Sequence, residues 1–245
     1  MLFNECFCEN TEYKIYRDFG ENKILECSNC GLYRSFPLPT ESVSGDNYQQ
    51  INDIQELHYH QLCVLRKVMK AANSKSAKIL DVGCSTGNML MYLKNKGYKN
   101  ISGVDMNDFA INISQQKNLN VKKMDSEKLV SDDKYDVIYL NHVLEHIGNL
   151  KEFISKVSRI LLNGSHLIIA VPNINGKYTN SKDWIGYQFS QHYWHFTSDS
   201  LEKIFKENNF KLIDKTILTG GRIKSKLFKL FKWEGDSLIS VFKYE

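Results

Sequence analysis

Short apolar segments alternate with helical segments from residue 78 onward, and this alternation constrains the fold more than any other feature of the chain. Apolar runs typical of buried strands lie at 78–83, 101–106, 119–124, 135–143 and 165–173. Segments with helical patterns separate them, at 84–97, 108–117 and 149–164. Strands that alternate with helices predict an α/β protein built on an open parallel sheet.

A glycine-rich turn, GCSTG at 83–87, joins the first strand to its helix. In a doubly wound fold this turn lies where a nucleotide-like ligand binds, and glycines there let the backbone approach the ligand. Asp81 precedes the turn, and Asp105 ends the second strand, where a carboxylate can accept both ribose hydroxyls. Asp125 and Ser126 follow the third strand, where an adenine ring would lie. The sequence therefore predicts a site for a nucleotide-like cofactor.

Four segments resemble successive motifs of the class I S-adenosylmethionine-dependent methyltransferases: ILDVGCSTGNML, ISGVDM, KKMDSEKL and YDVIYLNHVLEHI. The turn lacks the Gly-x-Gly-x-x-Gly spacing of NAD enzymes. The resemblance runs from about residue 78 to the C-terminus. It implies a doubly wound, mostly parallel, seven-stranded Rossmann-like sheet with an antiparallel last strand, and an enzyme that uses S-adenosylmethionine.

The resemblance also implies which residues bind the cofactor. They are Asp81, Gly83, Cys84, Gly87, Asp105, Met106, Asp125, Ser126, Asn141 and His142. Asp81 and the two glycines would line the methionine part, Asp105 would bind the ribose, and Met106 would pack on the adenine ring. Asp125 and Ser126 would hold the edge of that ring, whereas Asn141 and His142 would lie beneath the sulfonium. Cys84 would contribute backbone contacts alone.

The segment NHVLEHI at 141–147 contains His-x-x-Glu-His, which read alone is the inverted zinc-peptidase signature. A zinc peptidase needs both histidines on a stable helix, whereas this segment follows a buried strand and runs into Gly148. We therefore reject a zinc peptidase. Two interpretations stay open. In the first, Glu145 and His146 only shape the loop. In the second, they hold a divalent cation near the acceptor, as acidic residues and a histidine at this turn similarly can in quinone-type O-methyltransferases. His142 stands here in place of one of those acidic residues.

The loop after the fifth strand, residues 172–197, is expected to bind the acceptor, and we call it the acceptor loop. Its segment QHYWHFTSDSL at 191–201 resembles a segment of a small-molecule branch of this family, which places substrates in this loop. The candidate substrate-binding residues are Glu145, Tyr178, Trp184, Tyr187 and Tyr193. Some of these rings are expected to serve packing alone. A hydroxyl acceptor needs a base, and the candidates are, in order, His195, His192, His142 and His146. Thr197 or Ser198 is expected to cap the following helix.

Four of the six cysteines form two close pairs near the N-terminus, Cys6 with Cys8 and Cys27 with Cys30. The segment between the pairs can form a hairpin, so residues 1–36 look like a small zinc ribbon whose closed, structural site has four thiolate ligands. A segment of this length cannot bury enough core to fold alone, and a zinc ion would supply the missing stability. The alternative is four unligated thiols on a flexible arm.

Residues 37–75 are interpreted as a linker and a lid helix, with His58 and His60 on its surface, and residues 76–245 as the methyltransferase domain. Residues 222–233 form a basic amphipathic insertion. We expect this insertion to pack against the sheet edge or a homodimer partner; the alternative is contact with a phosphate-bearing substrate or peripheral contact with a membrane surface. No segment has the pattern of a signal peptide or a membrane span, so we expect a cytoplasmic protein with reduced cysteines.

Charge and layout together rank three functions. The favoured one is methyl transfer to a small hydroxyl- or amine-bearing metabolite, above all a sugar, a nucleotide sugar or a polysaccharide building block, because sugar methyltransferases with an N-terminal zinc element are similar in layout. The second is an RNA methyltransferase whose ribbon grips RNA, which the net charge of only +4 and the few basic ribbon residues disfavour. The third is a non-catalytic scaffold that binds the cofactor.

Overall fold

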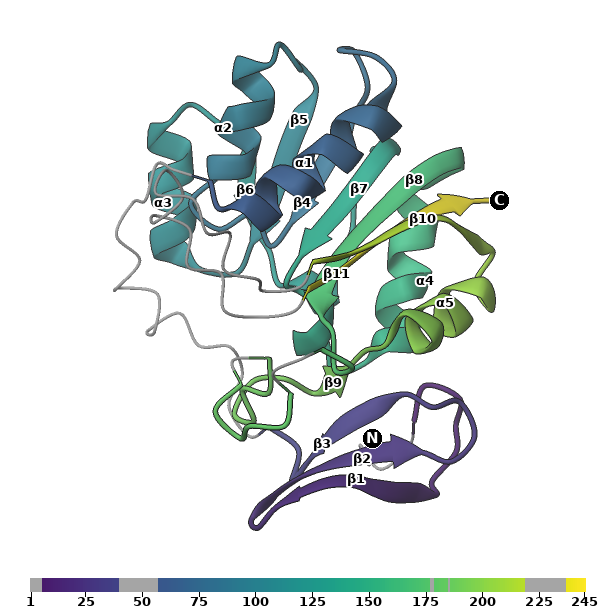
Figure 1. Cartoon of the computed structure of the whole chain (residues 1–245). Helices are drawn as coiled ribbons and strands as arrows, with labels where there is room; N and C mark the ends of the chain where they lie inside the picture. Colours follow the sequence, from purple (N-terminus) through teal and green to yellow (C-terminus); the bar gives the residue numbers. More distant parts are fainter. Residues whose placement is uncertain (1–5, 40–56, 177–178, 185, 219–236) are drawn as a thin grey trace, which may run out of the picture.

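The computed structural model describes residues 6–39, 57–176, 179–184, 186–218 and 237–245, whose strands form two sheets (Figure 1). The larger sheet has the order β10-β11-β8-β7-β4-β5-β6. Its strands are β4 (Ile79–Val82), β5 (Ile101–Asp105), β6 (Val121–Lys123), β7 (Tyr135–Asn141), β8 (Leu161–Pro172), β10 (Phe210–Leu218) and β11 (Ser237–Tyr244). Strands β6, β5, β4, β7 and β8 run parallel, and β11 is antiparallel to β8 and β10. This confirms the predicted seven-stranded sheet with an antiparallel last strand.

Helices cover both faces of this sheet. Successive residues of a strand point to opposite faces, so their packing partners show which helices lie on which face. In β7, Val137 and Tyr139 pack with residues of the first three helices, whereas Ile138 and Leu140 pack with residues of the last two (Figure 1). The helices are α1 (Tyr59–Ala72), α2 (Asn88–Asn95), α3 (Asp108–Gln116), α4 (Leu150–Ile160) and α5 (Ser198–Lys206), and two short 3-10 turns are η2 (Ser126–Lys128) and η3 (Leu144–His146). The expected lid helix is α1, which packs on the sheet at β7 and β8.

One helix end differs from the expected position. Helix α4 ends at Ile160 instead of continuing to Gly164, and β8 follows it directly. The pairing of β7 with β8 shifts between Tyr135 and Val137, so the residues before His166 form a bulge in which Gly164 has a φ of 82°. The glycine that seemed to end a helix therefore belongs to an irregular strand.

Side chains cap the starts of α3, α4 and α5, and in α4 Oδ1 of Asn149 accepts from the backbone N–H of Glu152 at 3.1 Å. Asn107, rather than Asp108, is the N-cap of α3, and its Oδ1 accepts a hydrogen bond from the backbone N–H of Ala110 at 2.8 Å. Thr197 caps α5 as expected, accepting from the backbone N–H of Ser200 at 3.0 Å. Each cap satisfies a donor of the first helical turn and fixes where the chain enters the helix.

The smaller sheet joins the N-terminal cysteine segment to the acceptor loop. Its order is β1-β2-β3-β9, with β1 (Tyr13–Phe19), β2 (Asn22–Cys27), β3 (Tyr33–Phe36) and β9 (Trp194–His195). The expected hairpin is β1–β2, but the sequence did not predict β3 or its antiparallel pairing with β9. We call residues 6–36 the ribbon. Cys6, Cys27 and Leu32 of the ribbon share a hydrophobic core with Trp194 and with α4 and α5.

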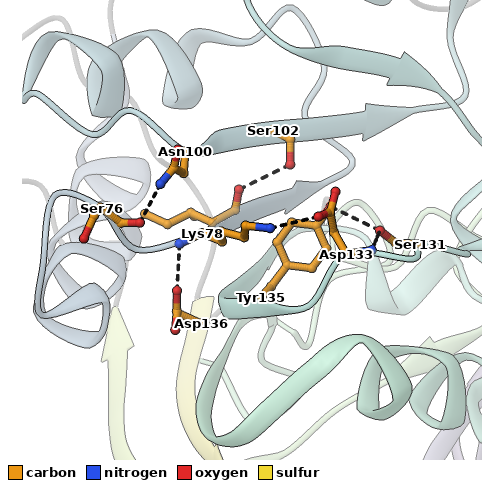
Figure 2. Close-up of polar contacts among 9 residues, drawn as sticks. Ser76, Lys78, Asn100, Ser102, Ser131, Asp133, Tyr135 and Asp136 are labelled. Carbon is orange, nitrogen blue, oxygen red and sulfur yellow. Dashed lines mark hydrogen bonds and ion pairs between the residues drawn. The ribbon is translucent and has the colours of Figure 1, made fainter.

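Polar contacts fasten the amino-terminal edge of the larger sheet around the start of β4 (Figure 2). The backbone N–H of Lys78 donates to Oδ2 of Asp136 at 2.8 Å, and its Nζ pairs with Asp133 at 2.9 Å. Nδ2 of Asn100 donates to the carbonyl of Ser76 at 2.6 Å. These contacts tie together the segments before β4, β5 and β7, so the carboxyl ends of the same strands are aligned at the opposite edge.

Three predicted features lie outside the described residues: Tyr178, the basic amphipathic insertion at 222–233, and residues 40–56 of the linker. Among the helices that the structure describes, none combines the length and the apolar composition that a bilayer crossing requires.

Candidate active site

The glycine-rich turn leaves the carboxyl end of β4 in a left-handed backbone conformation. Gly83 and Gly87 have φ values of 77° and 76°. A Cβ at Gly83 would lie 2.3 Å from Cγ2 of Val143, and one at Gly87 would lie 2.4 Å from Cδ1 of Leu119. Close approach of a ligand was the expected reason for these glycines. The structure adds a second reason, because side chains of the protein itself fill the space that a Cβ would need, and the contact with a ligand stays a prediction.

Asp81 is buried beside this turn. Its Oδ2 accepts a hydrogen bond from the hydroxyl of Tyr139 at 2.6 Å, whereas its Oδ1 has no partner among the described residues. Burial, together with the nearby carboxylate of Asp105, raises the pKa of Asp81 to about 8, against the effect of the Tyr139 hydrogen bond. A buried carboxylate oxygen without a donor is unfavourable unless a ligand supplies one. Asp81 therefore fits the predicted contact with the methionine part of the cofactor.

Asp105 ends β5 with both carboxylate oxygens engaged by the backbone. Oδ2 accepts from Ser85 N–H at 2.8 Å and Oδ1 from Asn107 N–H at 2.9 Å. Burial raises the pKa of Asp105, and these backbone hydrogen bonds oppose the shift. Each oxygen can accept a second hydrogen bond, which suits the two hydroxyls of a ribose. The adjacent Met106 is 38% exposed and offers the apolar surface that an adenine ring needs.

Cys84 packs against the interior of the fold. A Cβ at Gly103 would lie 2.8 Å from its Sγ, and the Cys84 thiol is buried. Burial raises the pKa of this thiol, so it stays protonated. These observations agree with a residue that contributes its backbone and not a nucleophile.

The carboxyl ends of four neighbouring strands bring the predicted cofactor residues to one edge of the larger sheet. The backbone N–H of Met124 donates to the carbonyl of Asp105 at 2.8 Å, which joins the loop after β6 to the loop after β5. Asp125 then caps η2 by accepting from Glu127 N–H at 2.9 Å, and Ser126 begins this turn. The individual roles of Asp125 and Ser126 stay predictions.

Glu145 and His142 form a hydrogen-bonded pair in the turn after β7. Nδ1 of His142 lies 3.0 Å from Oε1 of Glu145, whose side chain is 1% exposed. Burial alone would raise the pKa of Glu145, but the His142 hydrogen bond and the nearby imidazoles lower it to about 2. An ionised carboxylate only accepts, so the hydrogen-bond network assigns the proton to Nδ1 and the lone pair to Nε2 of His142. A carboxylate that orients an imidazole in this way is the arrangement of a histidine base.

A buried histidine from α1 joins this pair. His60 is 6% exposed, its Nε2 lies 2.8 Å from Oδ1 of Asn141, and its ring centroid lies 5.0 Å from that of His142. The surface position expected for His60 was therefore wrong. Burial, followed by the electrostatic effect of the neighbouring His142, lowers the pKa of His60 to about 3. No signal in the sequence indicates the contact of His60 with Asn141. The apolar periodicity of α1 shows which face of the helix is buried, but not which of its residues lie at the end of β7.

The two leading base candidates are buried deeper than His142. Nδ1 of His192 donates to the carbonyl of Gly186 at 2.9 Å, and Nε2 of His195 lies 2.9 Å from Oγ of Ser35. Burial lowers the pKa of His192 to about 4 and that of His195 to about 3. Both imidazoles are therefore neutral and are weaker bases than an ordinary histidine.

Glu145, His146 and His192 bring three ligand atoms within 4.8 Å of one another. Nδ1 of His146 lies 3.2 Å from the carbonyl of Gln191, and its ring is 4.5 Å from that of His192. Oε2 of Glu145 is buried and has no hydrogen-bond partner among the described residues. This donor set suits a divalent cation. The turn is a 3-10 helix, not the α-helix of a zinc peptidase, and His142 is not in the group.

The aromatic rings of the acceptor loop are mostly packed against the ribbon. Trp184 and Tyr187 are 5% and 1% exposed and lie in a cluster with Ile24 of the ribbon and Ile174. Tyr193 is only partly buried. Packing therefore explains the first two rings, and contact of any of the three with an acceptor stays a prediction.

The four ribbon cysteines converge on one point. Sγ of Cys6 lies 3.3 Å from that of Cys30, Sγ of Cys8 lies 3.6 Å from that of Cys27, and all four sulfurs lie within 4.8 Å of one another. A tetrahedral zinc ion with bonds of about 2.3 Å separates its sulfurs by about 3.8 Å. None of the four cysteines is in a disulfide. The donor set therefore fits the predicted structural zinc.

Comparison with known proteins agrees with this geometry. The model of the family described as "Methyltransferase domain" matches residues 55–215. A ubiquinone biosynthesis O-methyltransferase of Rickettsia akari is 32% identical over 117 residues, which are 44% of this chain and 46% of that protein. A malonyl-[acyl-carrier protein] O-methyltransferase of Bacillus anthracis is 30% identical over 119 residues, 46% of this chain and 44% of that protein. The chain thus spans about half the length of these relatives.

Solved structures share the fold. The magnesium protoporphyrin IX methyltransferase of Synechocystis PCC 6803, with S-adenosylhomocysteine bound, has a TM-score of 0.58 at 20% identity, covering 76% of this chain and 84% of that one. An S-adenosylmethionine-dependent methyltransferase of Mesorhizobium loti has a TM-score of 0.59 at 13% identity, covering 75% of this chain and 97% of that one. The family match, with the sheet order and the site, shows that the chain belongs to the class I S-adenosylmethionine-dependent methyltransferases.

Proposed function

We propose that the chain transfers a methyl group from S-adenosylmethionine to a hydroxyl of a small metabolite, with a sugar, a nucleotide sugar or a polysaccharide building block as the favoured acceptor. The observation that carries this proposal is the His142–Glu145 pair, which supplies an oriented base beside the cofactor residues. The names of the two relatives describe O-methyltransferases, which supports an oxygen acceptor over a nitrogen acceptor.

S-adenosylmethionine supplies a methyl group that its sulfonium already activates, so the protein mainly has to align the acceptor oxygen, at about 3 Å. Nε2 of His142 accepts the hydroxyl proton as the new carbon–oxygen bond forms and the carbon–sulfur bond breaks. The ionised, buried Glu145 stabilises the resulting imidazolium through Nδ1. His192 and His195 stay neutral and serve as hydrogen-bonding groups of the acceptor wall. This changes the predicted order of the base candidates.

The charges of the ribbon favour a small acceptor over RNA. Lys23 pairs with Asp18 at 2.6 Å, the guanidinium of Arg17 donates to Thr179 and Asn180, and Arg34 is 4% exposed. An RNA-binding surface needs several solvent-exposed cations that can replace the counterions of the phosphates. Within the described ribbon, three of the basic side chains are thus already engaged or buried.

The test is methyl transfer from label-carrying S-adenosylmethionine into a cell extract, separated into small-molecule and RNA pools. We expect label in the small-molecule pool, and His142→Ala is expected to reduce it about 10²–10⁴-fold because the base is lost. Calorimetric affinity for S-adenosylhomocysteine should fall much less than transfer, because His142 is expected to lie beneath the sulfonium, whose charge and methyl group S-adenosylhomocysteine lacks. His166→Ala is the matched control and should leave transfer unchanged, because His166 pairs with Val137 near the amino-terminal end of β7, away from the candidate site.

Label in the RNA pool would replace the metabolite acceptor with RNA. A loss below about tenfold for His142→Ala, with a larger loss for His195→Ala, would return the role of the base to His195. Cofactor binding without transfer into either pool would favour the scaffold.

A further inference from the structure

The ribbon supplies a strand to the wall of the acceptor site. Strand β3 begins three residues after Cys30 and pairs antiparallel with β9, with Tyr33 opposite His195 and Arg34 opposite Trp194. The backbone N–H of Cys27 donates to the carbonyl of Leu32 at 2.9 Å, so the cysteine turn leads directly into β3. The position of the cysteines and the position of β9 are therefore linked by a few residues.

Ser35 of β3 contacts His195, one of the histidines of the proposed acceptor site. Its Oγ lies 2.9 Å from Nε2 of His195, and both side chains are buried, with exposures of 0% and 2%. The same residue donates its backbone N–H to the carbonyl of Tyr193 at 3.0 Å, and the backbone N–H of Tyr193 donates to the carbonyl of Glu145 at 2.9 Å. Hydrogen bonds thus connect the ribbon to the turn that carries the proposed base.

The hydrogen bond to Ser35 leaves one ring nitrogen of His195 for other use. Nδ1 of His195 is buried and has no hydrogen-bond partner in the described parts of the chain. A neutral imidazole has one donor and one acceptor nitrogen, and the partner of the first nitrogen decides the role of the second. A serine hydroxyl can donate to Nε2 or accept from its N–H, so the Ser35 contact fixes the orientation of the ring and with it the direction of Nδ1.

The remaining acceptor loop also rests on the ribbon. Ile24 of β2 packs with Trp184 and Tyr187, and Arg17 of β1 donates to Asn180 at 2.8 Å. Asn29 lies between Cys27 and Cys30, and its carbonyl accepts a hydrogen bond from Nζ of Lys203, on α5, at 3.2 Å. The ribbon thus contacts the acceptor loop through β1 and β2, and it contacts α5 through Asn29. A small unit of this kind depends on its metal for rigidity.

We propose that Ser35 is a positioning residue for methyl transfer, which orients His195 toward the acceptor, and that the ribbon with its four cysteines filled by zinc is a structural part of the acceptor site. This inference rests on the proposed function, because it takes the histidine cluster as the acceptor side. It assigns to the ribbon a role in aligning the acceptor and none in cofactor binding.

The test is nuclear magnetic resonance of the full-length, zinc-loaded protein labelled with ¹⁵N-histidine, with His195→Gln used to assign the signals. We expect His195 to show a single neutral tautomer in the native protein. Ser35→Ala should change this pattern to a mixture of tautomers, and Ser35→Thr, which keeps the hydroxyl, should restore it. Ser165→Ala is the matched control: this buried serine also makes one hydrogen bond, to the carbonyl of Tyr135, at the opposite edge of the sheet.

Two functional readouts accompany the spectra. Ser35→Ala should reduce label transfer from S-adenosylmethionine into the small-molecule pool about tenfold, the size of one lost buried hydrogen bond. Calorimetric affinity for S-adenosylhomocysteine should stay unchanged. Removal of zinc from the native protein by a chelator should shift the signals of His195 and His192, while those of His166 on the far side of the sheet stay in place; this measurement does not depend on the folding of any variant.

Unchanged His195 signals, either in folded Ser35→Ala or after zinc removal, would overturn the inference even if the protein is a methyltransferase. A protein that binds no S-adenosylhomocysteine and labels no pool would instead contradict the proposed function, while the His195 signals would still report on Ser35. The two failures are therefore distinguishable.

Discussion

Buried acidic side chains at the candidate site differ because their surroundings differ. Glu145 accepts a hydrogen bond from His142 and lies near His146 and His192, and these imidazoles lower its pKa to about 2 despite burial. Asp81 has a tyrosine hydroxyl as its hydrogen-bond partner and a second carboxylate nearby, and burial raises its pKa to about 8. The first residue is therefore an ionised partner for a base, whereas the second is held partly protonated near neutral pH until a cationic ligand approaches.

Asp105→Ala is expected to weaken binding of S-adenosylhomocysteine about tenfold or more, because a carboxylate that binds ribose hydroxyls contributes charge-assisted hydrogen bonds. Calorimetry measures this affinity. Asp108→Ala is the control, since this neighbouring acid is exposed and pairs only with Lys123 at 2.6 Å among the contacts described. Equal affinity of Asp105→Ala and native protein would remove the ribose assignment.

At the scale of elements, the turn between β4 and α2 depends on close packing as well as on its backbone conformation. Gly83→Ala is expected to destabilise the fold by about 1–3 kcal/mol, because the added Cβ meets Val143. Urea denaturation measures the change in unfolding free energy. Gly97→Ala has a similar φ of 86° but nothing within 4 Å of the added Cβ, so it isolates the effect of backbone strain. Equal losses for the two variants would show that the contact with Val143 is unimportant.

The ribbon is the element whose stability depends on a ligand. We expect about one zinc ion per chain, with a lower melting temperature after chelation, because four thiolates and a small core stabilise a ribbon only together with the metal. Cys30→Ser should lose the zinc. Cys63→Ser, which changes a buried cysteine of α1 far from the cluster in sequence, should retain it. A metal-free preparation that melts at the same temperature would contradict the zinc site.

At the scale of the whole molecule, buried histidines make stability depend on pH. His60, His192 and His195 have pKa values lowered to about 3, 4 and 3 from the ordinary value of 6.5. The unfolded chain therefore takes up protons below about pH 6.5 that the folded chain does not, and each histidine lowers the unfolding free energy by about 1.4 kcal/mol per pH unit there. Asp81 and Asp105 act in the opposite direction, because their raised pKa values let the folded chain hold protons that the unfolded chain releases.

We therefore expect the unfolding free energy to decrease as pH falls from about 6.5 toward 4, since three histidines outweigh two carboxyl groups. Urea denaturation at several pH values measures the slope. His60→Gln removes one of the three groups and should make the slope smaller, whereas His166→Gln should leave most of it. A free energy that stays constant over this range would show that these histidines are not buried in the neutral form.

The sequence determined the order of strands and helices, the glycine turn and the acidic residues at strand ends. These features follow from local periodicity and from turn chemistry, which need no knowledge of distant contacts. The cysteine pairs likewise indicated one metal site, because ligand type and spacing are local properties.

The tertiary structure alone decided which residues meet around the histidines. His60 reaches Asn141, and Ser35 reaches His195, across separations of 81 and 160 residues. Strand β9 has only two residues, too few for a periodic pattern, and it forms because β3 lies beside it. The burial that weakens His195 as a base also depends on the ribbon, since Ser35 lies against its ring. Such contacts depend on the whole fold, since no local pattern in either segment encodes its partner.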